Sequence, residues 1–226
     1  MAQIILFDID LTLITTNGAG RTAIETAFEK AFGVPQATTG VSFDGRTDYG
    51  IFMEIIAAHG VSDGDPAAAY RRLVETYLLE IGPSLAGREG HLLPGVLPLL
   101  TSMRETHKLG LATGNLRRGA EAKLRHFGIW DHFAGGGFGD DSPIRSELVR
   151  HGIEEMAALL SIEPDARDCI VLGDTPLDVE AAHRAGAPAL AVATGRSTME
   201  ALTNSGAEWV LPDLSDTRQV LEILRS

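Results

Sequence analysis

The sequence predicts an α/β protein in which a doubly wound parallel sheet carries an inserted helical segment. The chain opens with the apolar run Ile4-Ile5-Leu6-Phe7, which is typical of a strand buried on both faces. Residues 15–90 show helical patterns without a convincing strand, whereas strand-length apolar runs alternate with helical patterns from Pro94 onward. We therefore expect a Rossmann-like core, residues 1–14 and 91–226, interrupted by a helical insertion, residues 15–90.

The inserted segment is expected to contain three helices. Apolar residues recur at helical spacing over residues 21–32, and Gly33 to Pro35 end that pattern. A polar, turn-rich stretch separates this helix from a second one over residues 48–59. A third helix is expected from about Pro66 to Ile81, with Gly82-Pro83 and the glycines of residues 87–90 marking its exit.

The rest of the core follows a strand and helix alternation. Apolar runs predict strands at residues 108–113, 132–138, 168–173, 187–193 and 208–211. Amphipathic spacing predicts helices at residues 96–107, 116–127, 147–160, 177–185, 199–204 and 217–224. This order predicts a parallel sheet with helices on both faces.

Composition excludes several classes of protein. The 226 residues suffice for one large α/β domain or for a core with a smaller insertion. A net charge of −12, from 19 basic and 31 acidic residues, argues against broad nucleic-acid binding. No apolar run exceeds strand length, so we expect no membrane span, and the first residues lack a signal-peptide pattern. Cys169 is the only cysteine, which fits a reducing cytoplasm.

Two carboxylates follow the first predicted strand directly. Asp8 and Asp10 come after the apolar run, and Thr12 follows two residues later. A buried carboxylate is costly without a counter-charge, so two of them indicate a cation between them. Because open α/β sheets bind ligands at the carboxyl ends of their strands, this pair predicts a metal site, and oxygen ligands favour Mg²⁺. Taken alone, the same residues also fit an acidic turn capped by Thr12.

Later strand ends add further polar groups. The apolar run 169–173 ends in Asp174, which is placed to share a cation with Asp8, and Asp178 follows one helical turn on. Asp178 also fits simple helix capping, because the helix dipole favours a carboxylate there.

A third polar group follows the strand expected at residues 108–113. It consists of Thr113, Gly114 and Asn115, a hydroxyl followed by a glycine turn and a helix start. This arrangement is suited to holding an anion, although Thr and Asn are also ordinary helix starters.

Three motifs together resemble the haloacid dehalogenase superfamily. They are Phe-Asp-Ile-Asp-Leu-Thr-Leu at residues 7–13, Leu-Ala-Thr-Gly-Asn at 111–115, and Leu-Gly-Asp-Thr-Pro-Leu-Asp at 172–178. They occur in the order typical of that superfamily, at strand ends, with a helical insertion after the first strand. The subgroup that the chain resembles has a helical cap and includes phosphoglycolate phosphatase-like and β-phosphoglucomutase-like enzymes.

The resemblance implies a role for each matching position. Asp8 corresponds to the nucleophile that forms an aspartyl-phosphate, and Asp10 to the general acid–base, whose backbone carbonyl also binds Mg²⁺. Asp174 and Asp178 correspond to the remaining metal-binding acids. The motif of Thr113, Gly114 and Asn115 corresponds to the phosphate-holding group.

The chain departs from the pattern of the superfamily at two positions. Leu11 stands where a glycine is usual. The superfamily also has a lysine, or less often an arginine, before its last acidic motif, and no lysine follows Lys123. The site cation is therefore expected to be Arg145, with Arg150 as the rival. Arginine keeps its charge at any working pH and forms paired hydrogen bonds with phosphate and carboxylate.

A loop in the insertion resembles the substrate-facing loop of capped relatives. It covers residues 43–48 and contains Arg46, which is expected to meet an anionic leaving group. A turn with Thr47 as helix cap fits the same residues equally well.

The resulting functional hypothesis is a cytoplasmic, Mg²⁺-dependent phosphatase that acts on a small phosphate ester, as a monomer or homodimer. A phosphomutase shares the aspartyl-phosphate and is the nearest alternative enzyme. A non-catalytic phosphate-binding regulatory protein is the alternative from another class, because fold alone does not establish activity.

Overall fold

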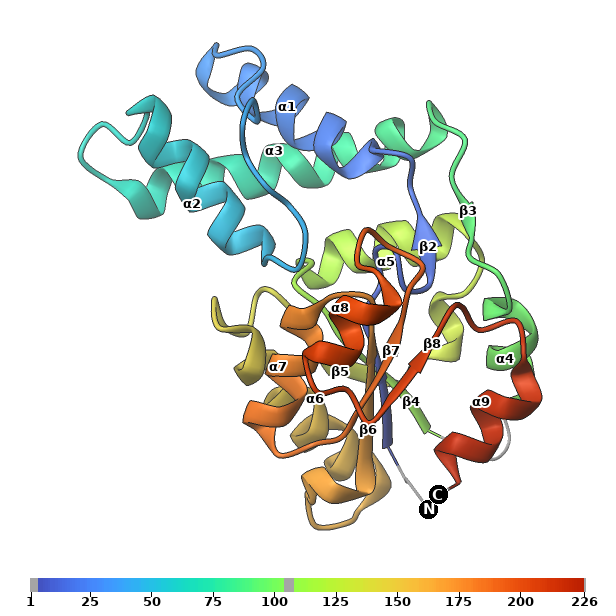
Figure 1. The fold of residues 1–226 in the computed structure, drawn as a ribbon. Helices are drawn as coiled ribbons and strands as arrows, with labels where there is room; N and C mark the ends of the chain where they lie inside the picture. Colours follow the sequence, from blue (N-terminus) through green and yellow to red (C-terminus); the bar gives the residue numbers. More distant parts are fainter. Residues whose placement is uncertain (1–3, 104–107, 226) are drawn as a thin grey trace.

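A six-stranded parallel sheet forms the centre of the protein in the computed structural model, which describes residues 4–103 and 108–225 (Figure 1). The strand order is β5-β4-β1-β6-β7-β8. The strands are β1 (Ile4–Phe7), β4 (Lys108–Ala112), β5 (Gly135–Gly137), β6 (Cys169–Gly173), β7 (Ala189–Val192) and β8 (Trp209–Leu211). All neighbouring pairs in this sheet run parallel, which confirms the predicted fold class.

Helices cover both faces of the sheet, so the central strand is apolar throughout. Ile5 and Phe7 of β1 pack into one core cluster with helices α4, α5 and α9, and Ile4 and Leu6 pack into the other with α6, α7 and α8. The helices are α4 (Val96–Met103), α5 (Arg117–His126), α6 (Arg145–Leu160), α7 (Pro176–Ala185), α8 (Met199–Asn204) and α9 (Thr217–Leu224). Alternate residues of one strand thus serve two cores, as period-two geometry requires. The last four residues of the helix expected at 96–107 lie outside the described residues.

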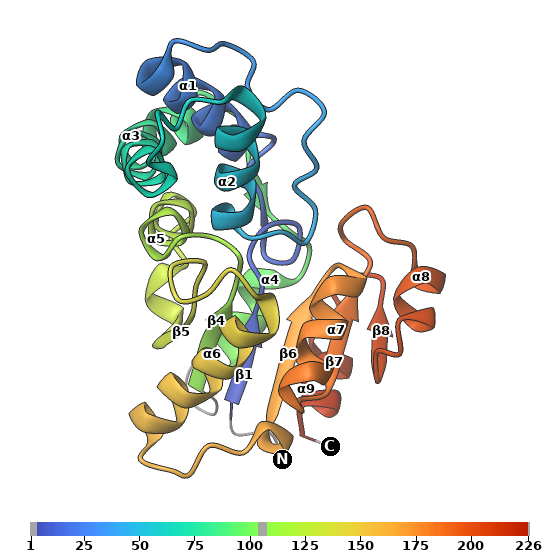
Figure 2. The ribbon, with the colours of Figure 1, turned by 90° about the vertical axis from the view of Figure 1, so that its left-hand side faces the viewer.

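A unit of three helices lies beyond the carboxyl ends of the strands (Figure 2). It consists of α1 (Ala19–Phe32), α2 (Asp48–His59) and α3 (Pro66–Ala86), which share a hydrophobic cluster of their own. Two short antiparallel strands, β2 (Ile14–Thr15) and β3 (His91–Leu92), connect this helical unit to the sheet. The chain therefore leaves and re-enters the core through one two-stranded ribbon.

Helix α3 is longer than the sequence predicted. It passes through Gly82 and Pro83 and ends at Ala86, so the expected exit at residue 82 is wrong. Ile81 and Leu85 are both buried in the cluster of the helical unit, on either side of the proline. Their burial outweighs the one backbone hydrogen bond that a proline removes.

Among the described residues, no helix combines the length and the apolar character that crossing a bilayer requires.

Candidate active site

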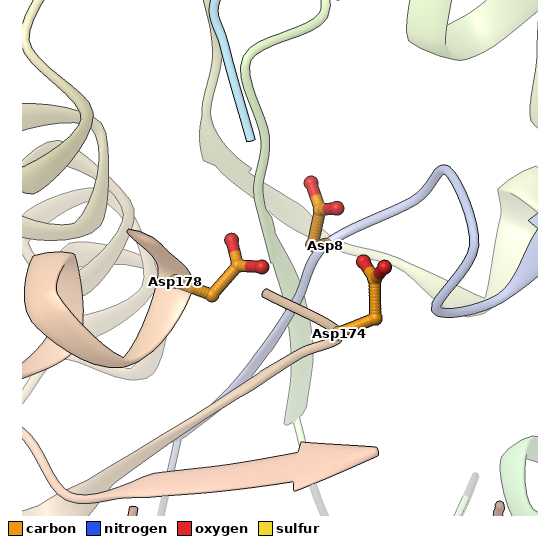
Figure 3. Close-up of side chains that lie close together, drawn as sticks. All are labelled: Asp8, Asp174 and Asp178. Atoms are coloured by element: carbon orange, nitrogen blue, oxygen red, sulfur yellow. The ribbon is translucent and has the colours of Figure 1, made fainter. Parts of the chain in front are cut away.

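Three carboxylates from distant parts of the sequence meet at the carboxyl edge of the sheet (Figure 3). Asp8 follows β1, Asp174 follows β6, and Asp178 lies in the first turn of α7. One carboxylate oxygen from each residue lies within 4.8 Å of those of the other two. The parallel pairing of β1 with β6 brings Asp8 and Asp174 together, because paired strands end at the same level.

Arg145 supplies the positive charge beside these carboxylates. It is the first residue of α6, and its Nη2 lies 3.1 Å from Oδ1 of Asp8. Its Nε donates to Oδ1 of Asp178 over 2.9 Å, and its Nη2 contacts the same oxygen. Arg150, the rival from the sequence, lies about 140° further around the helix and donates to the backbone oxygen of Arg184.

The carboxylates are buried, and burial sets their protonation. Burial raises the pKa of Asp8 to about 7, against the opposing effect of Arg145 and with support from Asp178. Burial, with Asp178 and Asp8 as neighbours, likewise raises the pKa of Asp174 to about 8. Three ionised carboxylates and one guanidinium leave two negative charges. This set of oxygen donors fits a divalent cation such as Mg²⁺, which would replace the protons.

Local hydrogen bonds hold the acids in position. The hydroxyl of Thr12 donates to Oδ1 of Asp174 over 3.3 Å. Oδ2 of Asp178 accepts from the backbone N–H and the hydroxyl of Thr175, which together form a capping box at the start of α7. The capping interpretation of Asp178 is therefore confirmed, while its other carboxylate oxygen contacts Arg145 beside the acidic cluster, and its role as a metal ligand stays a prediction.

Leu11 adopts the backbone conformation that explains the usual glycine at its position. Its φ is 62°, in the left-handed region that costs a non-glycine residue roughly 1–2 kcal/mol. Its backbone oxygen accepts a 2.6 Å hydrogen bond from the hydroxyl of Thr194 in the loop after β7. The tight bend after Asp10 is thus kept without a glycine.

Asp10 belongs to a second polar group beside the first. Its side chain lies outside the cluster of Asp8, Asp174 and Asp178. Oδ2 of Asp10 accepts from Nζ of Lys123 over 2.6 Å and from Nδ2 of Asn115 over 2.8 Å. Only the backbone carbonyl of Asp10 therefore remains a candidate for the metal site that the sequence predicted.

Thr113 and Lys123 complete the second polar group. The fully buried hydroxyl of Thr113 accepts hydrogen bonds from Asn115, and Asn115 in turn accepts from Lys123 over 2.5 Å. The sequence analysis missed Lys123 as a site residue. Helical spacing in the sequence could have indicated its inward position, because Lys123 shares the buried face of α5 with Ala120 and Leu124.

The loop before α2 contacts the site from the helical unit. Asp48 donates its backbone N–H to the oxygen of Gly114 over 2.7 Å, and its Oδ2 accepts from the N–H of Leu116 over 2.9 Å. A Cβ at position 114 would lie 2.4 Å from the backbone oxygen of Arg46, so glycine permits this approach. Burial raises the pKa of Asp48 to about 6, although Lys123 acts in the opposite direction.

Arg46 itself is engaged elsewhere in this arrangement. Its Nη1 lies 2.5 Å from Oε2 of Glu54 on α2, and the hydroxyl of Thr47 accepts from the N–H of Gly50. Thr47 is therefore the helix cap, as one interpretation of this loop expected. Arg46 lines the cavity described next, and its contact with a leaving group stays a prediction.

A cavity of about 470 Å³ joins these groups between the sheet edge and the helical unit. Its floor includes Asp8, Asp10, Asp174, Arg145 and Lys123. Its walls in the helical unit combine apolar side chains, such as Ile24, Phe43 and Tyr77, with polar ones, such as Arg21 and Arg46. The acidic cluster and the group around Asp10 thus face a cavity of a size suited to a small molecule.

The chain belongs to the haloacid dehalogenase-like hydrolases, because the sequence model of that family matches residues 5–192. The resemblance inferred from the three motifs is thereby confirmed. The chain is 30% identical to a phosphoglycolate phosphatase of Synechococcus elongatus, over 99% of each protein.

Solved structures show the same fold. A hydrolase from Pseudomonas syringae superposes with a TM-score of 0.71 at 23% identity and full coverage of both chains. A haloacid dehalogenase-like family protein, SP0104 from Streptococcus pneumoniae, does so with a TM-score of 0.66 at 20% identity, over 98% of each chain.

Proposed function

We propose that this hydrolase is a Mg²⁺-dependent phosphatase that transfers the phosphoryl group of a small ester to Asp8 and then to water. The observation that carries the proposal is the meeting of Asp8, Asp174 and Asp178 with Arg145 at the floor of one cavity. Such a site suits a reaction in which two anions, a carboxylate and a phosphate, must approach each other.

Mg²⁺ would be held by Asp8, Asp174, Asp178 and the backbone carbonyl of Asp10. When bound, it would supply positive charge that offsets the repulsion between nucleophile and phosphate. A carboxylate oxygen of Asp8 forms a bond to phosphorus while the bond from phosphorus to the ester oxygen breaks. The guanidinium of Arg145 contacts both Asp8 and Asp178, so its positive charge offsets the repulsion between the two carboxylates and orients the nucleophile.

Asp10 is the proposed acid–base of both steps. In the first step its proton passes to the departing ester oxygen, so that an alcohol leaves. In the second step Asp10 takes a proton from water while that water attacks phosphorus and the bond to Asp8 breaks. Thr113, Gly114 and Asn115 would hold the phosphate oxygens at the end of β4.

Residues 15–90 are proposed to act as a cap that closes the cavity and excludes water. The contacts of Asp48 with Gly114 and Leu116 support this role, since they join the helical unit to the phosphate-holding turn. The Synechococcus relative supports a small substrate of the phosphoglycolate type, with Arg46 near its leaving group. Cys169 is the single cysteine of the sequence and is a buried free thiol, which supports a location in the reducing cytoplasm.

The proposal is tested by a screen of phosphorylated metabolites with Mg²⁺, read as release of inorganic phosphate. Asp8→Asn should lower turnover by about 10⁴-fold or more, because it removes the nucleophile. Asp131→Asn is the matched control, since the carboxylate of Asp131 is 87% exposed and does not line the cavity. Absence of release from every ester, or full turnover by Asp8→Asn, would contradict the proposal. Isomer formation with a bisphosphate primer, in place of phosphate release, would indicate a mutase.

A further inference from the structure

Lys123 is a buried lysine on a helix where the neighbouring cations are exposed. Its side chain is 6% exposed, whereas that of Arg125, two residues on, is 54% exposed. Burial of an ammonium group costs several kcal/mol unless it is paired and hydrogen-bonded. A lysine on another face of this helix would be solvated at no such cost. We therefore look for groups in the site that compensate for the burial of Lys123.

The contacts of Lys123 form a closed triangle of hydrogen bonds. Nζ lies 2.6 Å from Oδ2 of Asp10 and 2.5 Å from Oδ1 of Asn115, and Nδ2 of Asn115 lies 2.8 Å from the same Oδ2 of Asp10. Burial by itself lowers the pKa of Lys123, but the carboxylates of Asp10 and Asp48 outweigh it and raise the pKa. Lys123 is therefore a fixed positive charge at this position.

This triangle restrains a side chain that is otherwise open to the cavity. The side chain of Asp10 is 40% exposed, and both hydrogen bonds found for its carboxylate among the described residues fall on Oδ2. The restraint holds Oδ2 and leaves Oδ1 for proton transfer.

We propose that Lys123 is a positioning residue which, with Asn115, fixes the carboxylate of Asp10 so that Oδ1 serves the leaving group. The inference rests on the proposed function, because it needs Asp10 as the acid–base. The side-chain hydrogen bonds of Lys123 are with Asp10 and Asn115, and none found among the described residues joins it to Asp8, Asp174 or Asp178, so we assign its role to the position of Asp10. Helix α5 thereby belongs to the reaction machinery as well as to the core.

Leaving-group dependence distinguishes this role from a merely structural one. An alkyl phosphate needs its departing oxygen protonated, whereas 4-nitrophenyl phosphate has a leaving group that departs with little help. Lys123→Met should lower kcat/KM about 100-fold for an alkyl phosphate and about tenfold or less for 4-nitrophenyl phosphate, within the range that general acid catalysis contributes. A structural defect would lower both by the same factor.

Three further variants complete the experiment. In an Asp10→Asn background, Lys123→Met should change kcat/KM by less than about twofold, because residues that act as a unit are not additive. Lys123→Arg should restore part of the alkyl phosphate activity, since it keeps the charge. Lys30→Met is the matched control, because Lys30 forms an ion pair with Glu80 on the helical unit and is 58% exposed.

The outcomes separate this inference from the proposed function. Wild-type enzyme that releases no phosphate from either ester with Mg²⁺ overturns both. If the wild-type enzyme releases phosphate but Lys123→Met lowers kcat/KM equally for the two esters, or not at all, only the role of Lys123 is overturned. If Lys123→Met does not fold, the same ratio is measured on Lys123→Gln, and an equal fall there overturns the role. A larger fall for the alkyl ester, lost in the Asp10→Asn background, supports it.

Discussion

We predict that Mg²⁺, the metal proposed for the acidic cluster, stabilises this protein by an amount that grows as the pH rises from 5 to 8. Asp8 and Asp174 have pKa values of about 7 and about 8, raised from 3.8 chiefly by burial. Between pH 3.8 and these raised pKa values, the two carboxyls keep their protons in the metal-free folded chain, whereas the unfolded chain has already released them. Stability without metal therefore falls as the pH rises through this window. The proposed Mg²⁺ would replace the protons and oppose that fall.

The size of the effect follows from the same pKa values. A rise in pKa from 3.8 to about 7 for Asp8 corresponds to roughly 4 kcal/mol of lost stability above pH 7. For a chain of this length, 1 kcal/mol corresponds to about 2–4 °C in Tm, so Asp8 alone accounts for about 10 °C. At pH 5 both carboxyls are protonated, and Mg²⁺ must displace protons to bind.

Thermal unfolding at pH 5, 6, 7 and 8 tests this reasoning, with EDTA compared with MgCl₂ at constant ionic strength. The gain in Tm from Mg²⁺ should be small at pH 5 and about 10 °C at pH 8. Asp174→Asn should lose most of the gain, whereas Asp131→Asn should keep it. An equal gain at pH 5 and pH 8, or an undiminished gain in Asp174→Asn, would refute the reasoning.

Three other predictions follow from the site. Arg145→Met should lower turnover by roughly 10²–10³-fold, because it removes the cation beside Asp8, the proposed nucleophile. Arg150→Met should stay within twofold, and equal losses would show that proximity to Asp8 does not matter. Leu11→Gly should change the free energy of unfolding by no more than about 1 kcal/mol, towards higher stability, since relief of the left-handed φ offsets the flexibility of glycine; urea unfolding checks this, and a clear loss of stability would contradict it. Asp48→Ala should weaken closure of the helical unit by roughly 1–3 kcal/mol, because it leaves the N–H of Leu116 without its partner; small-angle scattering with a phosphate mimic should then show a larger radius than wild type, and identical profiles would count against it.

The fold was predictable because parallel sheets leave a strong pattern. Strands buried on both faces produce continuous apolar runs such as residues 169–173, and the intervening helices produce amphipathic spacing. The strand order is not encoded locally and emerged only in the structure. The end of α3 was also missed, because packing of Ile81 and Leu85 overrides the local signal of Gly82-Pro83.

The acids of the site were predictable for a geometric reason. Asp8 and Asp174 end parallel strands that are direct neighbours, so their side chains had to approach one another. Lys123 was missed because the direction of a lysine side chain depends on tertiary packing. Asp48 was missed as a core-facing residue for the same reason, since its partners Gly114 and Leu116 lie far away in the sequence.

The ribbon of β2 and β3 separates the segment that forms the sheet from the segment that forms the helical unit. Ile14 pairs with Leu92 and Thr15 with His91, so the insertion begins and ends on one pair of hydrogen-bonded strands. An insertion joined in this way takes the place of a hairpin turn, and its length and content can change without altering the order of the sheet. The segment between these strands can therefore be replaced without changing the sheet. A different insertion would line the cavity with other side chains above the same carboxylates, so substrate selectivity could change while the positions of the carboxylates stay the same.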